Sequence, residues 1–399
     1  MNILFVIPSL AKGGQEKAGM FLCNYLMEFH TVTVVCFEKR NEADFNYQCP
    51  IVRIYKNSTF FSKFETYFYR YKELKKVKKE LQPDCSIAFG NTAIIFNSLT
   101  SCNEKTFSSI RQSFYKQIGL KNINAKIHNF FYLRGIKKST KIVPVSNAIN
   151  LELKKYFNIN NQLYINNGYD IDNIQLKAKE TCFCFKENRF YFIHVGRFGP
   201  PKGHWHLIRI FSEIRKRDTK VRLLLLGGID HSSNVSNAIN EYCKKYLEKN
   251  NISWSYNETD DADVLFLGHQ INPYKYIARS HLFVFPSIWE GFPNALAEAM
   301  SCGIPVVSAD FPTGSKDLLL NETSDESYGL ILPAFVDDFT SETPYRMDEM
   351  DKIWSEKIME LINDNEKLCF YKEQALKRSK QFTVQKMGNT WNKLISNSI

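Results

Sequence analysis

Two glutamates lie eight residues apart in the segment SIWEGFPNALAEAMSCGIPVV, residues 287–307. Glu290 precedes a Gly-Phe-Pro-Asn turn, and Glu298 lies in the helix-forming run that follows, which Asn294 is expected to cap. Carboxylates accept hydrogen bonds from hydroxyl groups, and the first turn of a helix offers unpaired N–H groups to a phosphate. The spacing therefore predicts a site for a ligand that is partly polyhydroxylated and partly anionic.

Two cations flank a tight loop earlier in the chain. In HVGRFGPPKGHW, Arg197 follows Gly196, and Lys202 comes after a Pro-Pro pair. An Arg can bridge two oxygens of a diphosphate, while a Lys acts as a point charge. The pair Gly13-Gly14 follows the first apolar run of the chain and would let a backbone approach the same phosphate closely.

Buried strands must position these residues, and the sequence contains two series of them. Short apolar runs alternate with segments of helical pattern, which predicts parallel sheets covered by helices on both faces. The runs cover residues 3–7, 31–37, 85–90, 106–110 and 141–146, and then 189–196, 221–228, 264–268, 281–287, 303–309 and 328–333. We therefore expect two doubly wound halves that bind ligands at the carboxyl ends of their strands.

The charge of the chain is concentrated in its first half. Residues 1–180 contain 26 Lys+Arg and 14 Asp+Glu, a net charge of +12, whereas the remaining residues contain 26 and 28, a net charge of −2. This asymmetry predicts a polyanionic or membrane-surface partner for the first half. The sequence predicts no signal peptide and no membrane span, because it has no basic region before its first apolar run and no apolar run of sufficient length.

The ten cysteines are scattered along the chain. One Cys182-x-Cys184 pair is present, and there is no C-x-x-C motif. This spacing argues against a zinc site and against a disulfide framework. Reduced thiols in the cytoplasm are the expected state.

Taken in order, the motifs of this chain resemble glycosyltransferase family 4. The resemblance rests on Gly13-Gly14 with Glu16, Gly196-Arg197, Lys202-Gly203, Glu290-Gly291-Phe292-Pro293-Asn294, Glu298-Ala299 and Gly303-Ile304-Pro305-Val306-Val307. It covers nearly the whole chain, and ADFPTGSKDLL at residues 309–319 further resembles members that build bacterial surface polysaccharides. It implies an α/β GT-B fold, in which two Rossmann-like doubly wound domains face each other across a cleft.

The resemblance also implies a domain organisation and an activity. An N-terminal acceptor-binding domain would cover residues 1–175, a C-terminal nucleotide-sugar-binding domain residues 176–375, and a helix at 376–399 would cross back to the first domain. The enzyme would be a retaining, metal-independent hexosyl- or N-acetylhexosaminyltransferase that uses a UDP-sugar and no cofactor. Its acceptor would be lipid-linked or an oligosaccharide, in lipopolysaccharide O-antigen or capsule biosynthesis.

Carried over position by position, the family's roles fall on two sets of residues. The implied catalytic set is Glu290, Arg197, Lys202 and Arg111. The implied donor-binding set is Gly13, Gly14, Gly196, Gly268, His269, Gly291, Phe292, Pro293, Asn294, Ala295 and Glu298. Arg197 and Lys202 would stabilise the leaving diphosphate, and Glu298 would hold the ribose hydroxyls. Glu290 and the backbone of residues 291–294 would hold the donor sugar and the β-phosphate.

One position departs from the family pattern. Many members carry a histidine that faces the donor sugar after the strand matching TFSSI, whereas this chain reads Ile110-Arg111-Gln112. Arg111 is the expected substitute. The departure leaves the identity of the donor sugar open.

Residues 60–81, FFSKFETYFYRYKELKKVKKEL, form a candidate membrane-contact segment. At helical spacing, among lysines, it carries Phe61, Phe64, Phe68, Tyr71 and Leu74. Such a helix can lie on an anionic bilayer, or it can face the core and leave its polar back to solvent. The basic first half favours membrane contact, and with it a cytoplasmic protein associated peripherally with the inner face of the membrane.

Two other classes of protein fit part of the pattern. A nucleotide-sugar epimerase or hydrolase can share the two-domain cleft without a glycan acceptor, but it has little use for a basic half. A non-catalytic glycan- or nucleic-acid-binding module would account for the charge but not for the diphosphate residues. A nucleic-acid partner is therefore not expected.

Overall fold

The computed structural model describes residues 1–11, 13–38, 46–55, 63–114, 123–161, 163–320 and 327–398. The chain divides into two compact units: unit 1 comprises Met1–Tyr169 with Phe382–Ile399, and unit 2 comprises Asp170–Gln381. The boundaries expected at residues 175/176 and 375/376 fall six residues after the first structural boundary and six before the second. The acceptor- and donor-binding roles of the two units stay predictions.

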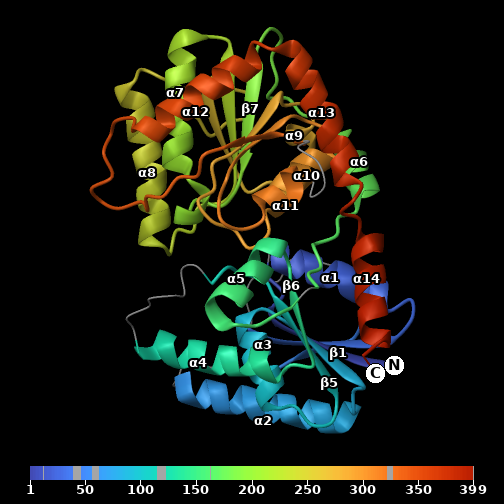
Figure 1. Ribbon diagram of the computed structural model, residues 1–399. Helices are drawn as coiled ribbons and strands as arrows, with labels where there is room; N and C mark the ends of the chain where they lie inside the picture. The colour runs from blue at the N-terminus through green and yellow to red at the C-terminus, as the bar shows by residue number, and fades with distance from the viewer. Residues whose placement is uncertain are drawn as a thin grey trace. The chain divides into compact units, whose positions relative to one another are not determined.

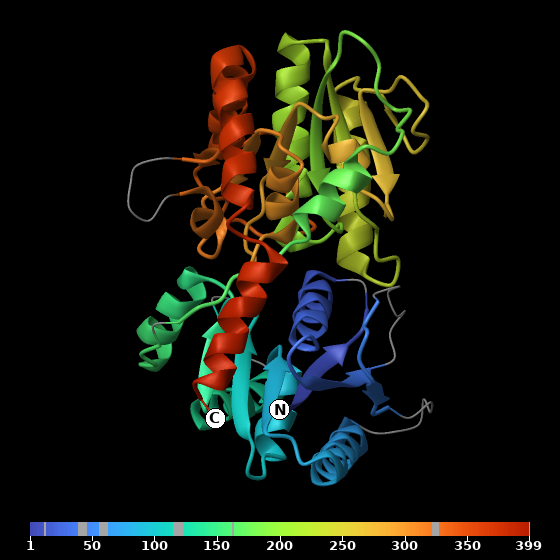
Figure 2. The same ribbon diagram turned by 90° about the vertical axis from the view of Figure 1, so that its right-hand side faces the viewer.

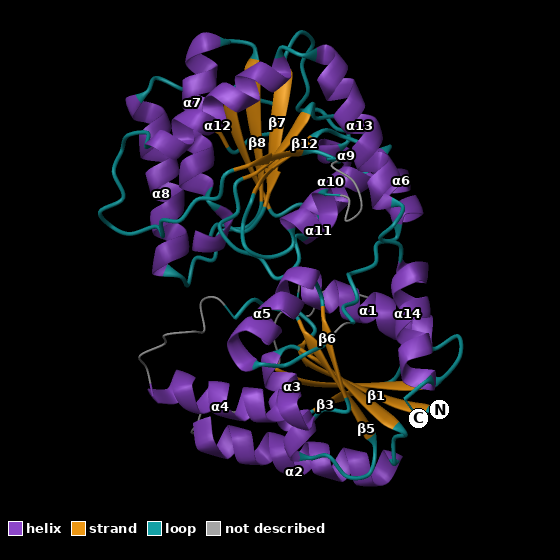
Figure 3. Ribbon diagram, in the orientation of Figure 1, coloured by secondary structure: helices purple, strands orange, loops and turns teal. Residues whose placement is uncertain are grey.

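Unit 1 is built on a parallel sheet in the order β3-β2-β1-β4-β5-β6 (Figure 1). Its strands are β1 (Asn2–Ser9), β2 (Thr31–Glu38), β3 (Ile51–Arg53), β4 (Cys85–Phe89), β5 (Lys105–Ile110) and β6 (Lys141–Pro144). Its helices are α1 (Gly14–Leu26), α2 (Lys63–Leu81), α3 (Asn91–Leu99), α4 (Ile123–Lys138), α5 (Asn147–Phe157) and α14 (Val384–Ser396). The helices α2, α3 and α4 lie on one face of the sheet, and α1 and α14 lie on the other (Figures 1 and 3).

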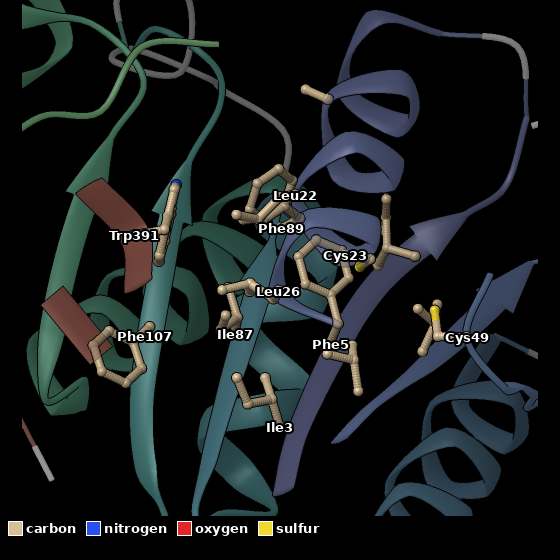
Figure 4. Close-up of a cluster of buried hydrophobic side chains, with 14 of the residues drawn as sticks. Ile3, Phe5, Leu22, Cys23, Leu26, Cys49, Ile87, Phe89, Phe107 and Trp391 are labelled. Atoms are coloured by element: carbon tan, nitrogen blue, oxygen red, sulfur yellow. The ribbon is translucent and has the colours of Figure 1, made fainter. Parts of the chain in front are cut away.

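The last helix, α14, completes the core of unit 1. Its Trp391 is 1% exposed, and the Trp391 ring centroid lies 6.2 Å from that of Phe89 and 6.5 Å from that of Phe107 (Figure 4). Figure 2 shows α14 lying over the sheet of unit 1, next to α1. A Cβ at Gly388 would overlap the ring of Tyr25 on α1, so the two helices approach each other as closely as a glycine allows.

Unit 2 is a second parallel sheet, in the order β13-β12-β11-β7-β8-β10-β9. Its strands are β7 (Phe190–Val195), β8 (Val221–Leu226), β9 (Trp254–Ser255), β10 (Val264–Gly268), β11 (Leu282–Phe285), β12 (Val306–Ala309) and β13 (Leu330–Leu332). Its helices are α6 (Ile171–Ala178), α7 (His204–Arg217), α8 (Asn234–Lys249), α9 (Tyr274–Ile277), α10 (Asn294–Ser301), α11 (Ser315–Leu319), α12 (Glu349–Ile362) and α13 (Asn365–Ser379), with a 3₁₀ turn at Pro200–Lys202. The helices α7, α8 and α12 pack on one side of the sheet, and α6, α9, α10 and α13 on the other (Figures 1 and 3).

The prediction of two doubly wound parallel sheets is confirmed, and each predicted strand is present. Two strands were not predicted. Both β3 and β9 are edge strands of three and two residues, which is too short for an apolar pattern to show. Among the described helices, none is both long and apolar enough to cross a membrane.

Candidate functional site

The loop that joins β7 to α7 is fastened to the segment that follows β11. The amide of Ile288 donates a hydrogen bond of 2.8 Å to the carbonyl of Pro201. Gly203 has φ +64°, and a Cβ there would overlap the carbonyl oxygen of Pro286. Both the conformation and the close approach require glycine at this position. The loop thereby carries Lys202, the residue before Gly203, to the carboxyl end of β11.

Lys202 and Glu290, two of the predicted catalytic residues, form an ion pair there. Lys202 Nζ lies 2.5 Å from Glu290 Oε1, and the Ser287 hydroxyl donates to the same oxygen at 2.9 Å. The two side chains are 23% and 14% exposed, so water screens their attraction only in part. The structure therefore brings together the predicted diphosphate cation and the predicted sugar-binding carboxylate.

Residues after β12 support the Glu290 turn from outside. The Thr313 hydroxyl donates a hydrogen bond to the backbone carbonyl of Glu290. Gly314 has φ +94°, and a Cβ there would lie 2.8 Å from Cδ of Pro293. The stretch at residues 309–319, which the sequence related only to a subgroup of the family, thus holds the site turn in place.

Residues 291–295 form this turn and the first residues of α10. The expectation that Asn294 caps the helix is wrong. Asn294 is the first residue of α10, and Pro293 is its N-cap. The amide of Asn294 donates to the carbonyl of Phe292 at 2.9 Å, and the amide of Leu296 donates to that of Pro293 at 3.1 Å. Because backbone carbonyls close the turn, a side-chain cap from Asn294 is not needed. The role of this backbone in donor binding stays a prediction.

Glu298 lies on α10 and is held by a residue that the sequence did not indicate. The hydroxyl of Tyr274, the first residue of α9, donates to Glu298 Oε1 at 3.1 Å. Tyr274 is buried, and burial together with the neighbouring Glu298 raises the pKa of its hydroxyl, which therefore stays a donor at neutral pH. The contact fixes the direction of the carboxylate.

Arg197 is the exposed member of the cation pair. Among the described residues, no acidic oxygen lies within 4.0 Å of its guanidinium, in contrast to the paired Lys202. The pKa of the nearby Asp230 carboxyl is lowered, chiefly by hydrogen bonds from Ser232 and to a smaller extent by Arg197. Arg197 can therefore meet an incoming anion without first leaving an ion pair.

A pocket of about 260 Å³ lies at the carboxyl ends of β7, β8 and β10. The predicted residues Gly268 and His269 line it, together with the aromatic rings of Phe198, Tyr256 and Phe266. Aromatic walls of this kind stack on planar rings. Phe198 could have been suspected from its place next to Arg197, whereas Tyr256 lies in a polar stretch that carries no signal.

Backbone contacts join this pocket to the loop between β7 and α7, which carries Arg197 and Lys202 and is called the cation loop below. The amide of Gly196 donates to Leu226 at 2.8 Å, and that of Gly227 donates to Gly268 at 2.7 Å. A Cβ at Gly227, which has φ +147°, would overlap the carbonyl oxygen of Gly196. The ends of three strands are thus tied together around the pocket. The Gly-Gly pair that follows the apolar residues 223–226 is a sequence signal that could have indicated this close approach.

Three histidines near the cation loop belong to the interior of unit 2. His194 and His204 are 0% and 1% exposed, and burial lowers the pKa of His194 to about 4. The Nδ1 atom of His194 lies 2.9 Å from the carbonyl of Val284. His194 is therefore a neutral core residue of β7.

The third histidine, His206, belongs to a cluster that could be taken for a metal site. Ligand atoms of His206, Asp337 and Asp348 lie within 4.8 Å of one another. The guanidinium of Arg209 already lies 3.1 Å from Asp351 and 3.4 Å from Asp348, and His206 lies 2.8 Å from Asp351. Arg209 therefore already compensates Asp348 and Asp351, and His206 lies 3.2 Å from Asp337, so a metal ion here would have to displace a buried cation.

The remaining predicted residues, Gly13, Gly14 and Arg111, lie in unit 1, after β1 and β5. Gly13 is extended and Gly14 begins α1. Arg111 is 8% exposed, donates to the side-chain carbonyl of Asn167, and lies over the ring of Phe89 at 4.6 Å. Burial lowers its pKa to about 10, so it stays charged at neutral pH. The structure thus divides the predicted site residues between the two units.

Comparison with known proteins bears on this arrangement. Residues 183–334 match the model of the family described as glycosyl transferases group 1. An uncharacterized glycosyltransferase of Methanocaldococcus jannaschii is 29% identical over 67% of this chain and 60% of its own length. The 4-alpha-N-acetylgalactosaminyltransferase of Campylobacter jejuni that acts on N-acetylgalactosamine-N,N'-diacetylbacillosaminyl-diphospho-undecaprenol is 26% identical over 67% of this chain and 63% of its own length. The chain thus spans about three fifths of the length of these relatives.

Solved structures resemble the chain over its whole length. HepE of Anabaena in complex with UDP superposes with a TM-score of 0.77 at 16% identity and covers 100% of both chains. WaaG, a glycosyltransferase involved in lipopolysaccharide biosynthesis, gives a TM-score of 0.72 at 11% identity and covers 99% of both chains. These likenesses confirm the GT-B fold. The family match and the sequence relatives confirm the resemblance to the glycosyltransferases that build bacterial surface polysaccharides.

Proposed function

We propose that this chain, which matches the group 1 glycosyltransferases over residues 183–334 and has the GT-B fold, transfers a sugar from a nucleotide-sugar donor to a glycan or lipid-linked acceptor. One observation carries the proposal: the cation loop, the Lys202–Glu290 pair and the aromatic pocket meet at the carboxyl edge of the unit 2 sheet. A UDP-sugar is the proposed donor, because HepE, which shares the fold, has been solved with UDP and with UDP-glucose.

The parts of the donor map onto this edge in order. The base stacks in the pocket against Phe198 and Tyr256, and the ribose hydroxyls bond to Glu298, whose carboxylate Tyr274 orients. The diphosphate lies beside Arg197 and Lys202. The pocket and the cation loop share the backbone at Gly196, and this continuity supports one extended ligand.

The Lys202–Glu290 pair supports a specific sequence of events on donor binding. A diphosphate offers Lys202 several anionic oxygens, so the ammonium turns from Glu290 to the ligand. The freed carboxylate of Glu290 then accepts hydrogen bonds from the sugar hydroxyls. As the bond from sugar to phosphate breaks, negative charge grows on the leaving diphosphate, and the preorganised cations stabilise it. Transfer with retention and without a metal ion or cofactor is the mechanism proposed.

A lipid-linked acceptor is proposed for unit 1. The relative from Campylobacter jejuni acts, by its name, on a diphospho-undecaprenol substrate. The net charge of +12 over residues 1–180 favours a surface that meets anionic lipid headgroups. The proposed role of the enzyme is the transfer of a sugar in bacterial capsule or O-antigen biosynthesis.

The helix α4 offers the best membrane-contact face in the described part of unit 1. Ile127, Phe130 and Phe131 are 52%, 63% and 39% exposed, although each is a large apolar side chain. The same face continues with exposed basic side chains, and α4 contains no acidic residue. The exposed residues of this α4 face are Lys126, Ile127, Phe130, Phe131, Arg134, Lys137 and Lys138. Their spacing of three and four residues forms one stripe, as in helices that lie on anionic bilayers.

The segment at 60–81 offers less exposed apolar surface for membrane contact than its sequence suggested. Phe61 and the side chain of Phe64 lie outside the described residues. Phe68 is 61% exposed, but Leu74 faces the core, and Lys78 is buried in an ion pair with Glu104 at 2.6 Å. The helix α2 is therefore a core-facing helix with one exposed aromatic edge. We place the membrane contact on α4 instead.

Thermal unfolding with nucleotides tests the proposed donor site. UDP, GDP, ADP, CMP and NAD are compared without added metal, because a ligand that binds only the native state raises its stability by about 2.7 kcal/mol at roughly 100 times its Kd. Stabilisation by UDP that Arg197→Ala abolishes is the expected result. Stabilisation by none of the five would contradict the donor site, and release of free sugar or an epimer without acceptor would indicate the epimerase or hydrolase alternative.

A further inference from the structure

Two thiols lie side by side in the segment that connects α6 to β7. The Sγ atoms of Cys182 and Cys184 are 3.5 Å apart, and Cys182 is partly exposed whereas Cys184 is buried. A second thiol pair, Cys23 with Cys49, lies in the core of unit 1, where both residues are at least 94% buried (Figure 4). Only the first of these two pairs combines thiol contact with access to solvent.

The backbone around this pair is held by Tyr191. Its hydroxyl donates to the carbonyl of Cys184 at 3.2 Å and accepts from the amide of Lys186 at 2.8 Å. The Phe185 ring packs edge-on against the Tyr191 ring at 4.7 Å. The fold therefore holds the two thiols next to each other. To form a disulfide bond of about 2 Å, the two Sγ atoms would have to approach only slightly from their distance of 3.5 Å.

The electrostatic surroundings give the two thiols different roles. A hydrogen bond from the Cys184 thiol lowers the pKa of Cys182, although burial and the charge of Glu258 act in the opposite direction, and Lys275 adds a smaller lowering. The same contact and burial raise the pKa of Cys184. Thiolates, and not thiols, are the nucleophiles in cysteine oxidation, so Cys182 attacks first and Cys184 resolves the product.

We propose that Cys182 and Cys184 are a redox-modification site, at which a hydroperoxide converts the two thiols into a reversible disulfide. The Cys182 thiolate attacks the hydroperoxide ROOH, the O–O bond breaks, and Cys182–SOH forms with release of the alcohol ROH. The Cys184 sulfur then attacks the Cys182 sulfur and forms the S–S bond, while the S–OH bond breaks and its hydroxide leaves as water with the Cys184 proton. In sum, two thiols and ROOH give a disulfide, ROH and H₂O, and the two electrons come from the thiols.

Tyr276 lies near the two thiols and bonds to residues that neighbour the pocket lining in the chain. The Tyr276 hydroxyl lies 2.6 Å from Glu258 Oε2 and 3.3 Å from Gln270 Oε1, and Tyr276 lies close enough to both thiols for their charges to act on its pKa. Tyr256 and His269, which line the pocket, are close neighbours of Glu258 and Gln270 in the chain. Oxidation is therefore expected to lower the affinity for UDP, an effect that rests on the proposed donor site.

Peptide mass spectrometry tests the modification without reference to the donor. Both thiols lie in one tryptic peptide, ETCFCFK at residues 180–186, which contains no other cysteine. After mild hydroperoxide treatment of the native full-length protein, this peptide is expected to lose the mass of two hydrogens, and dithiothreitol is expected to restore it. The Cys184→Ser protein should instead show a sulfenic acid at Cys182 that dimedone traps.

The exposed Cys369, in the peptide LCFYK, is the matched control, because it is more accessible than Cys182 but, among the described residues, lies beside no second thiol. The proposal would be overturned if Cys369 were oxidised before Cys182 and Cys184. It would also be overturned if the 180–186 peptide from the treated native protein still carried both thiols. UDP binding is then compared between the reduced and the oxidised protein. If the disulfide forms and the affinity is unchanged, the redox site stands and its connection to the pocket is wrong.

Discussion

Lys202 and Glu290 illustrate how one contact can prepare a site for two ligand groups. Each side chain neutralises the other at 2.5 Å, so neither leaves an uncompensated charge in a partly buried turn. The proposed donor, which brings a diphosphate and hydroxyl groups together, would replace both halves of the pair at once. A free phosphate would replace only one half and would leave Glu290 without its cation. We therefore expect the pair to favour the complete nucleotide-sugar over a free phosphate.

Replacing Lys202 tests its part in stabilising the leaving group. We expect Lys202→Ala to lower kcat by about 10²–10³, the usual effect of removing one preorganised group that stabilises developing negative charge. Release of nucleoside diphosphate from the donor measures this. Lys357→Ala is the matched control, because the Lys357–Glu360 pair, at 2.8 Å, is exposed on α12 and lies outside the candidate site. Equal rates in the two variants would remove Lys202 from the catalytic set.

Tyr274 gives a second prediction at this scale. Tyr274→Phe keeps the ring but removes the hydrogen bond to Glu298, and hydrogen bonds to charged groups contribute about 1.5–3 kcal/mol. We expect the affinity for UDP to fall by roughly tenfold or more, as measured by calorimetric titration. Tyr156→Phe, an exposed tyrosine of α5, should bind UDP as the unmodified chain does. Unchanged affinity in Tyr274→Phe would mean that Glu298 does not hold the ribose.

At the scale of elements, α2 and α4 differ although both are basic helices on the same face of the unit 1 sheet (Figure 1). The core of unit 1 takes Leu74 and the paired Lys78 from α2, so that helix is oriented by its buried face. The buried face of α4 includes Tyr132 and Ile136, which leaves Phe130 outside with the basic residues. Helical spacing alone could not tell which of the two helices presents an apolar stripe to solvent.

Vesicle sedimentation tests the α4 face. The double variant Ile127→Ser and Phe130→Ser should reduce binding to vesicles that contain phosphatidylglycerol, since it removes apolar side chains that would enter the lipid interface. Leu176→Ser is the matched control, because Leu176 is 66% exposed on α6 of unit 2. Binding that is equal in the double variant and in the control would show that α4 is not the contact. Salt should weaken binding by the unmodified chain through the basic residues of the same face.

At the scale of the whole molecule, the chain ends in the unit in which it begins. The segment after Gln381 returns to unit 1, where Tyr169 and Thr383 form a parallel bridge at the crossing point. Trp391, Met387 and Ile395 then complete the core beneath α1. The folding of unit 1 therefore depends on residues that follow unit 2 in the chain.

Replacing Trp391 tests this dependence. Removal of a buried Trp side chain costs about 3–5 kcal/mol, so Trp391→Ala should lower the unfolding midpoint of unit 1 in urea. Addition of UDP should still stabilise the transition of unit 2 in this variant, because the proposed donor site lies wholly outside the last helix. Phe370→Ala, at a residue that is 50% exposed on α13, is the control and should change neither transition by more than about 0.5 kcal/mol. Loss of UDP stabilisation in Trp391→Ala would show that the units do not unfold separately.

The sequence by itself determined the two series of strands and the segments that carry the candidate site. Runs such as 223–226 and 282–285 are apolar throughout because strands of a sheet covered on both faces have no solvent side, and this signal lies within each run. The Glu290 and Lys202 motifs are equally local. Each can be read from a few neighbouring residues whose types suit phosphate and hydroxyl groups.

Only the tertiary structure decided which of these segments meet. The approach of Lys202 to Glu290, of Tyr274 to Glu298 and of Tyr256 to the pocket joins residues far apart in the chain. The same holds for the docking of α14 on unit 1. Periodicity reports only that a residue faces the core or the solvent, because it depends on the geometry of one helix or strand. The partner across a contact depends on how several elements pack, and that information is not contained in any single segment.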